Sequence, residues 1–357
     1  MASQRVQNNT GESKQSAASS LLRNARLAFQ YLATELENLS GDIILRLSLT
    51  TKSVIFTTSS FATLSQRAAS RPELQHIQQI GEGLQGAIFE QVGQALVMKK
   101  EKPGNENVAS NLRHEYSLHS RVVAAFDRYA MSVGSEVLVP RLFGIILPSD
   151  TAFWQVNLHK FPEGYRSCTA VIQMGRILPL PKVIRRALVT QLYPYKDAVV
   201  DLEMTRSILH SPPNKHCLAR TYLGRKDGYL TQEKFTLRNI PLYLKSMERF
   251  GLDTQSLAAS MGKAYAIMHW GACINGDDIE FVLGSSAVRT QEQRLQHRAV
   301  HLFLLDFGQC EAVDLSGDVA AVYQAFKGAM VTGDNQLFIP HCKKSAQLFG
   351  AFRKALS

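Results

Sequence analysis

Three glycines in the first third of the chain have a spacing that suits phosphate binding. Gly81, Gly83 and Gly86 form the pattern G-x-G-x-x-G, whose backbone N–H groups can approach a phosphate because no side chain intervenes. The pattern alone fits a dinucleotide-binding turn between a strand and a helix, a turn between two strands that covers the phosphates of ATP, or a structural hairpin. Apolar alternation continues after Gly86 and predicts strands over 87–92 and 95–99, which favours the ATP-covering turn.

A lysine and a glutamate follow at positions that suit the same site. Lys99 ends the apolar run Leu96-Val97-Met98 in the second strand, where an ammonium group can reach the α- and β-phosphates. Glu115 lies in a segment of helical character over 106–128, and its carboxylate can hold the lysine by an ion pair. Both residues could instead be surface charges. Lys100 is an alternative to Lys99, because a shift of one residue places a side chain on the other face of a strand.

The sequence Asp306-Phe307-Gly308 suggests a metal ion beside the nucleotide. It follows the apolar residues Leu304 and Leu305, and a carboxylate at the end of a buried strand can bind Mg²⁺. The expected cofactors are therefore ATP and Mg²⁺. Only about ten residues separate Gly308 from the next predicted helix, and no A-P-E sequence follows, so a small-molecule acceptor fits better than a protein.

The catalytic loop departs from the kinase pattern. Counting back from the short strand predicted at 281–283 assigns Glu280 as a further metal ligand and Asn275 to the position of the catalytic aspartate. An asparagine side chain cannot accept a proton, so Asn275 predicts slow or absent turnover. Asp277 and Asp278 are the alternative catalytic residues if the loop is bent, or they are solvated residues of a turn.

These motifs predict an α+β, two-lobed protein-kinase-like fold with a small β-rich N-lobe and a larger, mostly helical C-lobe. The predicted segments are a disordered tail at 1–18, a helix and a Ser/Thr-rich linker at 19–75, a nucleotide-binding N-lobe at 76–178, and a C-lobe at 179–357 with an insertion around 182–235. Further expected elements are a helix from Ser20 to Leu39, strands at 137–147 and 169–174, a helix at 241–268, and a strand pair at 279–284 and 300–306.

Composition limits the partners and the compartment. The net charge is +10, from 40 basic and 30 acidic residues, but the basic residues are scattered and no nucleic-acid motif accompanies them. The five cysteines contain no C-x-x-C pair, which argues against a disulfide framework and against structural zinc. The N-terminus has no apolar signal sequence, and no window is apolar enough for a membrane span. A cytoplasmic or nuclear protein is expected, with an unknown small molecule or protein as its partner.

Several longer motifs carry a resemblance to an uncharacterised fungal family, domain of unknown function family 3669, from about residue 45 to the end. The motifs are Ser59-Ser60-Phe61-Ala62, Ile80-Gly81-Glu82-Gly83, Arg176-Ile177-Leu178-Pro179-Leu180-Pro181, Cys217-Leu218-Ala219-Arg220-Thr221-Tyr222-Leu223-Gly224, Leu237-Arg238-Asn239-Ile240-Pro241-Leu242, His269-Trp270-Gly271-Ala272, Asp278-Ile279-Glu280-Phe281-Val282-Leu283-Gly284 and Leu305-Asp306-Phe307-Gly308-Gln309-Cys310. The resemblance implies a fungal origin, a kinase-like fold and an accessory role in secondary metabolism. The family carries Asp at the position of Asn275, and N-D-P-Y where this chain has Gly333-Asp334-Asn335-Gln336.

Three functions are compatible with these residues. The first is an ATP-dependent phosphotransferase that acts on a small molecule. The second, favoured by Asn275, is a pseudokinase that serves as a scaffold or regulator. The third is a phosphate- or nucleic-acid-binding module that uses the basic residues between 182 and 245, and it ranks last.

Overall fold

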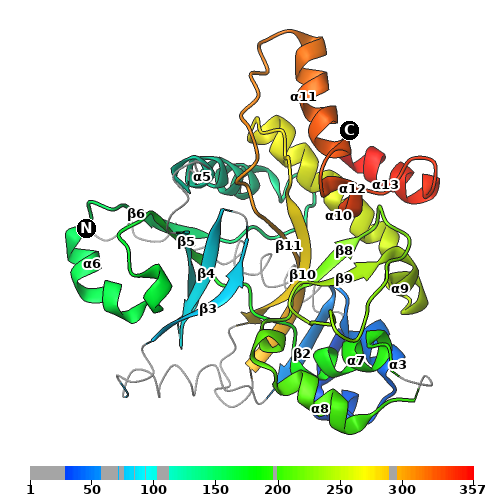
Figure 1. Ribbon diagram of the computed structural model, residues 1–357. Coiled ribbons are helices and arrows are strands. Elements are labelled where there is room, and N and C mark those ends of the chain that lie inside the picture. The colour runs from blue at the N-terminus through cyan, green and yellow to red at the C-terminus, as the bar shows by residue number, and fades with distance from the viewer. Residues whose placement is uncertain are drawn as a thin grey trace, which may run out of the picture.

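The computed structural model describes most of the chain as two β-sheets with helices packed around them (Figure 1). The described residues are 29–57, 71, 76–83, 85–92, 94–102, 112–195, 199–288 and 296–357. The tail predicted at 1–18 lies outside them. The combination of mainly antiparallel sheets with separate helices agrees with the predicted α+β class.

The first sheet has five antiparallel strands and carries the glycine-rich turn. In spatial order its strands are β3 (Ile77–Glu82), β4 (Gly86–Gln91), β5 (Leu96–Glu101), β7 (Val171–Gly175) and β6 (Leu142–Ile146), and the helices beside it are α5 (Leu112–Tyr129) and α6 (Thr151–Asn157). On one face, Phe89 and Met98 are buried against Trp154 of α6. On the other face, Leu112 of α5 packs against Ile172 of β7. Alternate residues of β5 therefore point toward different helices.

The second sheet has six strands and lies in the larger hydrophobic core. In spatial order its strands are β1 (Phe29–Leu32), β2 (Ser53–Thr57), β11 (Gln296–Leu305), β10 (Glu280–Val288), β8 (Ala219–Tyr222) and β9 (Ile240–Tyr243). The pairs β1–β2 and β8–β9 are parallel, and the others are antiparallel. β10 and β11 form the strand pair that the sequence predicts at 279–284 and 300–306.

Helices surround this second sheet (Figure 1). They are α2 (Ala33–Leu36), α3 (Gly41–Ser48), α7 (Lys182–Leu192), α8 (Leu202–His210), α9 (Leu244–Arg249), α10 (Thr254–Ala266), α11 (Val319–Val331), α12 (Asn335–Phe338) and α13 (Ala346–Leu356). Tyr265 of α10 is fully buried and contacts the rings of Phe281 and Phe352, so it joins β10 to α13. In the described part of the chain, no helix has both the length and the apolar character that a membrane crossing requires.

The N-terminal extension differs from its prediction. The helix expected to run from Ser20 to Leu39 is wrong over 29–32, which form strand β1. The Ser/Thr-rich linker expected after that helix, within 19–75, contains strand β2. The reason is tertiary pairing: β2 lies between β1 and β11, and Ile55 is fully buried in the larger core. A short apolar segment becomes a strand when a neighbouring strand is in place to pair with it, because strand propensity depends strongly on context.

The second half of the chain also contains more sheet than the sequence predicts. Strand β8 lies inside the segment predicted as an insertion, yet it is an interior strand between β10 and β9. The helix expected at 241–268 is divided into β9, α9 and α10. Gly251 separates the two helices with a φ of +69°, a left-handed conformation that glycine adopts without steric cost.

Candidate functional site

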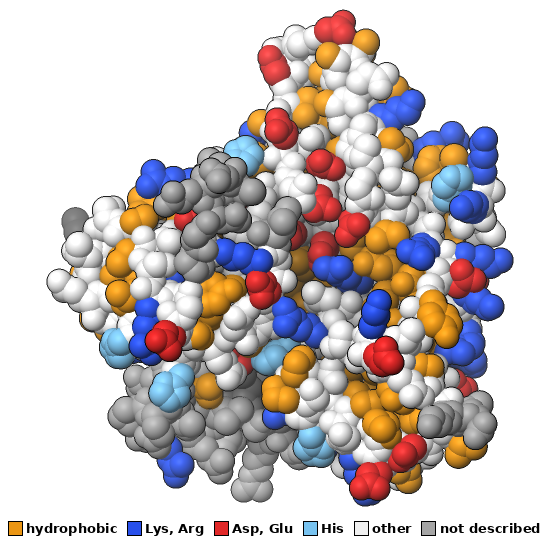
Figure 2. Space-filling view, viewed as in Figure 1, with side chains coloured by type: hydrophobic (Ala, Val, Ile, Leu, Met, Phe, Trp, Pro, Cys, Tyr) orange, Lys and Arg blue, Asp and Glu red, His pale blue; other side chains and the backbone are white. Residues whose placement is uncertain are grey.

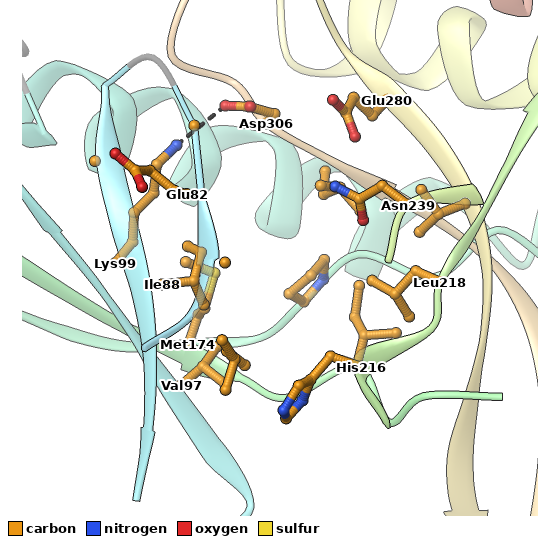
Figure 3. A pocket seen from close by; sticks show the side chains of 18 of the residues that line it. Glu82, Ile88, Val97, Lys99, Met174, His216, Leu218, Asn239, Glu280 and Asp306 are labelled. Atoms are coloured by element: carbon orange, nitrogen blue, oxygen red, sulfur yellow. Dashed lines mark hydrogen bonds and ion pairs between the residues drawn. The ribbon is translucent and has the colours of Figure 1, made fainter. Parts of the chain in front are cut away.

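A cavity of about 350 Å³ lies between the two sheets. One wall comes from β3, β4 and β5, and the other from β8, β10 and the end of β11 (Figure 3). Apolar side chains form its middle, and charged side chains lie toward its ends. The apolar lining includes Ile88, Val97, Met174, Leu218 and Val282. The volume lies in the range of small-ligand sites.

The three glycines lie in a turn between two strands, as predicted. β3 and β4 pair in antiparallel register, and the N–H of Gly83 donates to the carbonyl of Gly86 at 2.9 Å. Gly81, Gly83 and Gly86 all line the cavity. A Cβ at Gly86 would lie 2.5 Å from the backbone carbonyl oxygen of Lys100, so no side chain fits there. The glycines therefore do not form a dinucleotide-binding turn between a strand and a helix.

We expect alanine to be tolerated at Gly83 and not at Gly86. At Gly83 an added Cβ meets its nearest neighbour at 3.9 Å, an ordinary contact. At Gly86 it meets backbone, which cannot rotate away, and such overpacking costs about 1–3 kcal/mol. Chemical denaturation of Gly86→Ala, with Gly83→Ala as the matched control, measures the difference. Equal free energies of unfolding for the two variants would contradict this geometry.

Lys99 forms the centre of an ion-pair network. Its Nζ lies 2.7 Å from Glu115 Oε1 and 3.1 Å from Asp306 Oδ1. The side chains of Lys99 and Glu115 are only 8% and 4% exposed. Burial disfavours the charged ammonium, but the two carboxylates outweigh it and raise the pKa of Lys99. The ion pair expected from the sequence is present, and the lysine stays charged beside the cavity.

Lys100 occupies a different environment. Its side chain points to the other face of β5, where Nζ donates to the carbonyl of Ser167 at 2.6 Å and to Thr169 Oγ1 at 2.5 Å. It also lies 4.6 Å from the ring centroid of Trp154. Burial lowers the pKa of Lys100 to about 8. Of the two lysines, Lys99 lines the cavity.

Asp306 closes the network from the end of β11. Its φ is +67°, a left-handed conformation that is uncommon for non-glycine residues. Phe307 turns into the core and packs against the ring of His119, with 4.8 Å between centroids. Gly308 lies against the amide end of the Gln85 side chain, which would have to move to admit a Cβ. The turn after β11 thus contacts the glycine-rich turn.

The side chain of Asn275 is hydrogen-bonded to the backbone of its own loop and of the turn after β11. Its Oδ1 accepts hydrogen bonds from the backbone N–H of Glu311 at 2.9 Å and of Asp277 at 3.2 Å. His269 donates from Nε2 to the Asn275 carbonyl at 3.1 Å, and its ring stacks on Phe326. The asparagine therefore fixes the shape of the loop, and its side chain is outside the cavity lining.

Asp278 is the loop carboxylate that reaches the cavity. Of Asn275, Asp277 and Asp278, only Asp278 is part of the lining, and it has a φ of +53°. Its Oδ2 accepts a hydrogen bond from Gln309. Burial, followed by the nearby carboxylates of Asp334, Asp306 and Asp277, raises the pKa of Asp278 to about 6. A carboxyl with this pKa can exchange a proton near neutrality.

Glu280 lines the cavity but forms an ion pair with an arginine side chain. Its Oε1 accepts a hydrogen bond from Nη2 of Arg220 on β8. Burial raises the pKa of Glu280 to about 7, against the opposing effect of Arg220. Glu280 and Asp306 lie toward the same end of the cavity (Figure 3). Glu280, which the sequence predicts as a metal ligand, is therefore paired with the guanidinium group of Arg220 in this structure.

No family model matches the chain, and no curated protein matches it. The resemblance to the fungal family thus stays a prediction. Six of its eight motifs nevertheless share a location, because the cavity lining includes residues from Ile80–Gly83, Arg176–Pro181, Cys217–Gly224, Leu237–Leu242, Asp278–Gly284 and Leu305–Cys310. Residues 269–272 are not part of this lining. Ser59–Ala62 lies outside the described residues.

Two functional side chains were missed from the sequence. Arg220 is one of the basic residues between 182 and 245, and its pairing with Glu280 at the cavity was not expected. Asn335 stands in the segment that departs from N-D-P-Y, and its fully buried Nδ2 donates to the carbonyls of Gly276 and Ala329 at 2.7 and 2.8 Å. Asn335 thereby holds the loop that presents Asp278. A buried polar residue after an apolar helix was the one signal that could have indicated this contact.

Proposed function

We propose that the protein is a kinase-like phosphotransferase that binds ATP in this cavity and acts on a small-molecule acceptor. The observation that carries the proposal is the position of Lys99 Nζ between Glu115 and Asp306. A Cβ on Gly86 would lie 3.6 Å from Lys99 Cγ, so the glycine-rich turn lies directly beside this lysine. A charged ammonium beside a glycine-rich turn suits a chain of phosphates.

A two-lobed, kinase-like architecture is part of the same proposal. The five-stranded sheet with α5 would be the nucleotide-binding lobe, and the six-stranded sheet with its helices would be the second lobe. The cavity between the sheets supports this assignment. Only residues 309–318 separate Gly308 from α11, so the segment that seats a peptide in protein kinases is short, which favours a small acceptor.

Mg²⁺ fits this cavity at Asp306 and not at Glu280. Asp306 binds Lys99 through Oδ1, and its side chain is 37% exposed. Its Oδ2 forms no ion pair with any other residue in the described part of the chain, so it is available to a metal ion. Mg²⁺ is commonly held by one or two carboxylates together with phosphate oxygens and water. Glu280 is engaged by Arg220, and no group of three His, Cys, Asp or Glu residues in the described ranges forms a ready metal site. Bound Mg²⁺ would neutralise phosphate charge.

The residues of the chain would then divide the remaining work. Lys99 and the glycine-rich turn would hold the phosphates, and the apolar middle of the cavity would exclude water from the adenine. Asp278 would orient the acceptor hydroxyl and take its proton. Positioning and electrostatic stabilisation supply most of the acceleration in phosphoryl transfer.

ATP with Mg²⁺ is expected to stabilise the protein against heat. Ligand at 100 times its dissociation constant adds about 2.7 kcal/mol to the free energy of unfolding. Asp306→Ala should remove the dependence of this shift on Mg²⁺, because it removes the carboxylate that fits the ion. The measurement is thermal unfolding with ATP, with and without Mg²⁺. Absence of any shift at millimolar ATP would refute the proposal.

A pseudokinase is the second candidate, and the Arg220–Glu280 ion pair favours it. Arg220 binds the Glu280 carboxylate, which in a metal-dependent enzyme would be free to bind the metal ion. A pseudokinase would bind nucleotide without turning it over, and would act as a scaffold or regulator. Release of ADP from ATP, measured in the native protein and in Asp278→Asn, separates the two candidates.

A further inference from the structure

The two ends of the cavity carry opposite charge. At one end Asp278, Glu280 and Asp306 lie near Lys99 and Arg220, with acid in excess. At the other end lies His216, far from Asp306 and Glu280 in the close view (Figure 3). The surface view agrees, with acidic side chains gathered near the middle of this face and Lys, Arg and His side chains below them (Figure 2). Arg176 and Arg238 also line the cavity and lie near His216: burial, together with the positive charges of Arg176, Arg238 and Arg185, lowers the pKa of His216. This basic end, formed by Arg176, His216 and Arg238, has no role in the chemistry above.

Two further arginines lie behind the basic end. Arg298 is 7% exposed, and its guanidinium donates to the carbonyl of Pro179 at 2.9 Å and to Ser285 Oγ at 3.1 Å. Arg185 donates to the carbonyls of Leu180 and Asn214 at 3.2 and 3.1 Å. All these acceptors are neutral. Burial, and then the positive charges of Arg176 and Arg185, lower the pKa of Arg298 to about 10.

The acidic side chains beside this end do not balance it. Glu90 accepts from Arg176, and His216 Nε2 lies 4.0 Å from its Oε1. Glu82 lies beside Lys99 at the other end in the close view (Figure 3), where it is paired with Lys102 at 2.8 Å. Arg238, Arg185 and Arg298 form no ion pair with any carboxylate of the described ranges. Uncompensated positive charge next to a low-dielectric cavity is costly, and a bound anion offsets that cost.

We propose that Arg176, His216 and Arg238 form a second anion site, which binds a phosphate or carboxylate group at the end of the cavity remote from Lys99. Arginine presents several N–H donors in a planar fork that matches these oxyanions. The anion belongs either to the nucleotide, as an extra ribose phosphate, or to an acidic acceptor. Only this choice of source rests on the proposed function, because the anion site itself depends on the charges alone.

Inorganic phosphate is the probe that locates the site. We expect phosphate to raise the unfolding temperature of the native protein above that in potassium chloride of equal ionic strength. Arg238→Gln and His216→Gln should each weaken the phosphate affinity about tenfold, since a charge-assisted hydrogen bond is lost. Arg353→Gln, which removes an exposed charge on α13, is the matched control and should bind as the native protein does. Lys99→Met should retain phosphate binding.

Each outcome decides the proposal. Phosphate binding that Lys99→Met abolishes and Arg238→Gln preserves would place the anion at the glycine-rich turn and overturn the inference. A native protein with no phosphate shift beyond the chloride control would also overturn it. Phosphate binding that depends on Arg238, in a protein that binds no ATP, would refute the proposed nucleotide function and leave the anion site standing.

Two nucleotides identify the source of the anion. ADP is compared with ADP that carries an additional ribose phosphate. Tighter binding of the second nucleotide in the native protein, absent in Arg238→Gln, would assign the anion to the nucleotide. Equal affinity for the two nucleotides, together with unfolding-temperature shifts from ADP and from phosphate that add when both are present, would assign the anion to the acceptor. Competition between ADP and inorganic phosphate would show that both bind at one site, which would contradict a second anion site.

Discussion

Lys99→Met is expected to abolish ATP binding and to destabilise the fold. The substitution removes the cation between Glu115 and Asp306 and leaves the Glu115 carboxylate buried without a partner. Breaking a buried ion pair by removing one member costs about 3–5 kcal/mol. Isothermal titration with ATP and Mg²⁺ measures the binding, and denaturant unfolding measures the stability. The double variant Lys99→Met/Glu115→Gln should recover stability but not binding, because it removes the unpaired carboxylate while leaving the phosphates without their ammonium.

Lys100→Met is the control for this prediction. Lys100 is fully buried on the opposite face of β5, where its partners are the carbonyl of Ser167 and the hydroxyl of Thr169. Its replacement should destabilise the protein and leave the ATP affinity of the folded fraction unchanged. A loss of ATP binding in Lys100→Met, with retention in Lys99→Met, would reverse the assignment of the two lysines.

Asp278→Asn is expected to lower turnover about 10²–10⁴-fold, the usual contribution of general acid–base catalysis. Asp278 is the loop carboxylate that lines the cavity, and the amide keeps its size while it loses the ability to accept a proton. ATP affinity should change little, because Lys99 and the glycine-rich turn hold the phosphates. The measurement is phosphate or ADP release from ATP, with water as the acceptor until a better one is found.

Asn275→Asp should leave turnover unchanged. The carboxylate can accept the same two N–H donors, from Glu311 and Asp277, so the loop keeps its shape. The sequence pattern, which assigns Asn275 to the position of the catalytic aspartate, predicts instead that Asn275→Asp raises turnover. An increase in turnover for Asn275→Asp, with Asp278→Asn silent, would show that the loop adopts another conformation during catalysis.

The local motifs were predictable because each depends on residues that are close in sequence. The turn at Gly81–Gly86 follows from alternation on both sides of it, and the pairing of Lys99 with Glu115 follows from a strand and the next helix. The end of β11 at Asp306 follows from the apolar run before it. In each case the hydrophobic period and the turn residues point to one structure.

The errors have a common physical cause, which is contact between distant segments. Counting residues from a predicted strand assumes a loop of fixed shape, but Asn275 bonds to Glu311 and the loop bends, so Asp278 takes the place in the cavity. Arg220 acquires its meaning only when β8 is aligned with β10, which sets it beside Glu280. No local pattern distinguishes such an arginine from a solvated one.

Strand β2 has a consequence for how the chain is made. Phe56 pairs with His297, a residue synthesised about 240 positions later. At about 5–20 residues per second a ribosome needs at least ten seconds to deliver that partner. Val54 and Ile55, almost completely buried at the end, lack the covering strand β11 until then. The sheet that carries Asp306 therefore closes late, and the nascent chain presents an apolar strand that is a natural target for chaperones throughout most of its synthesis.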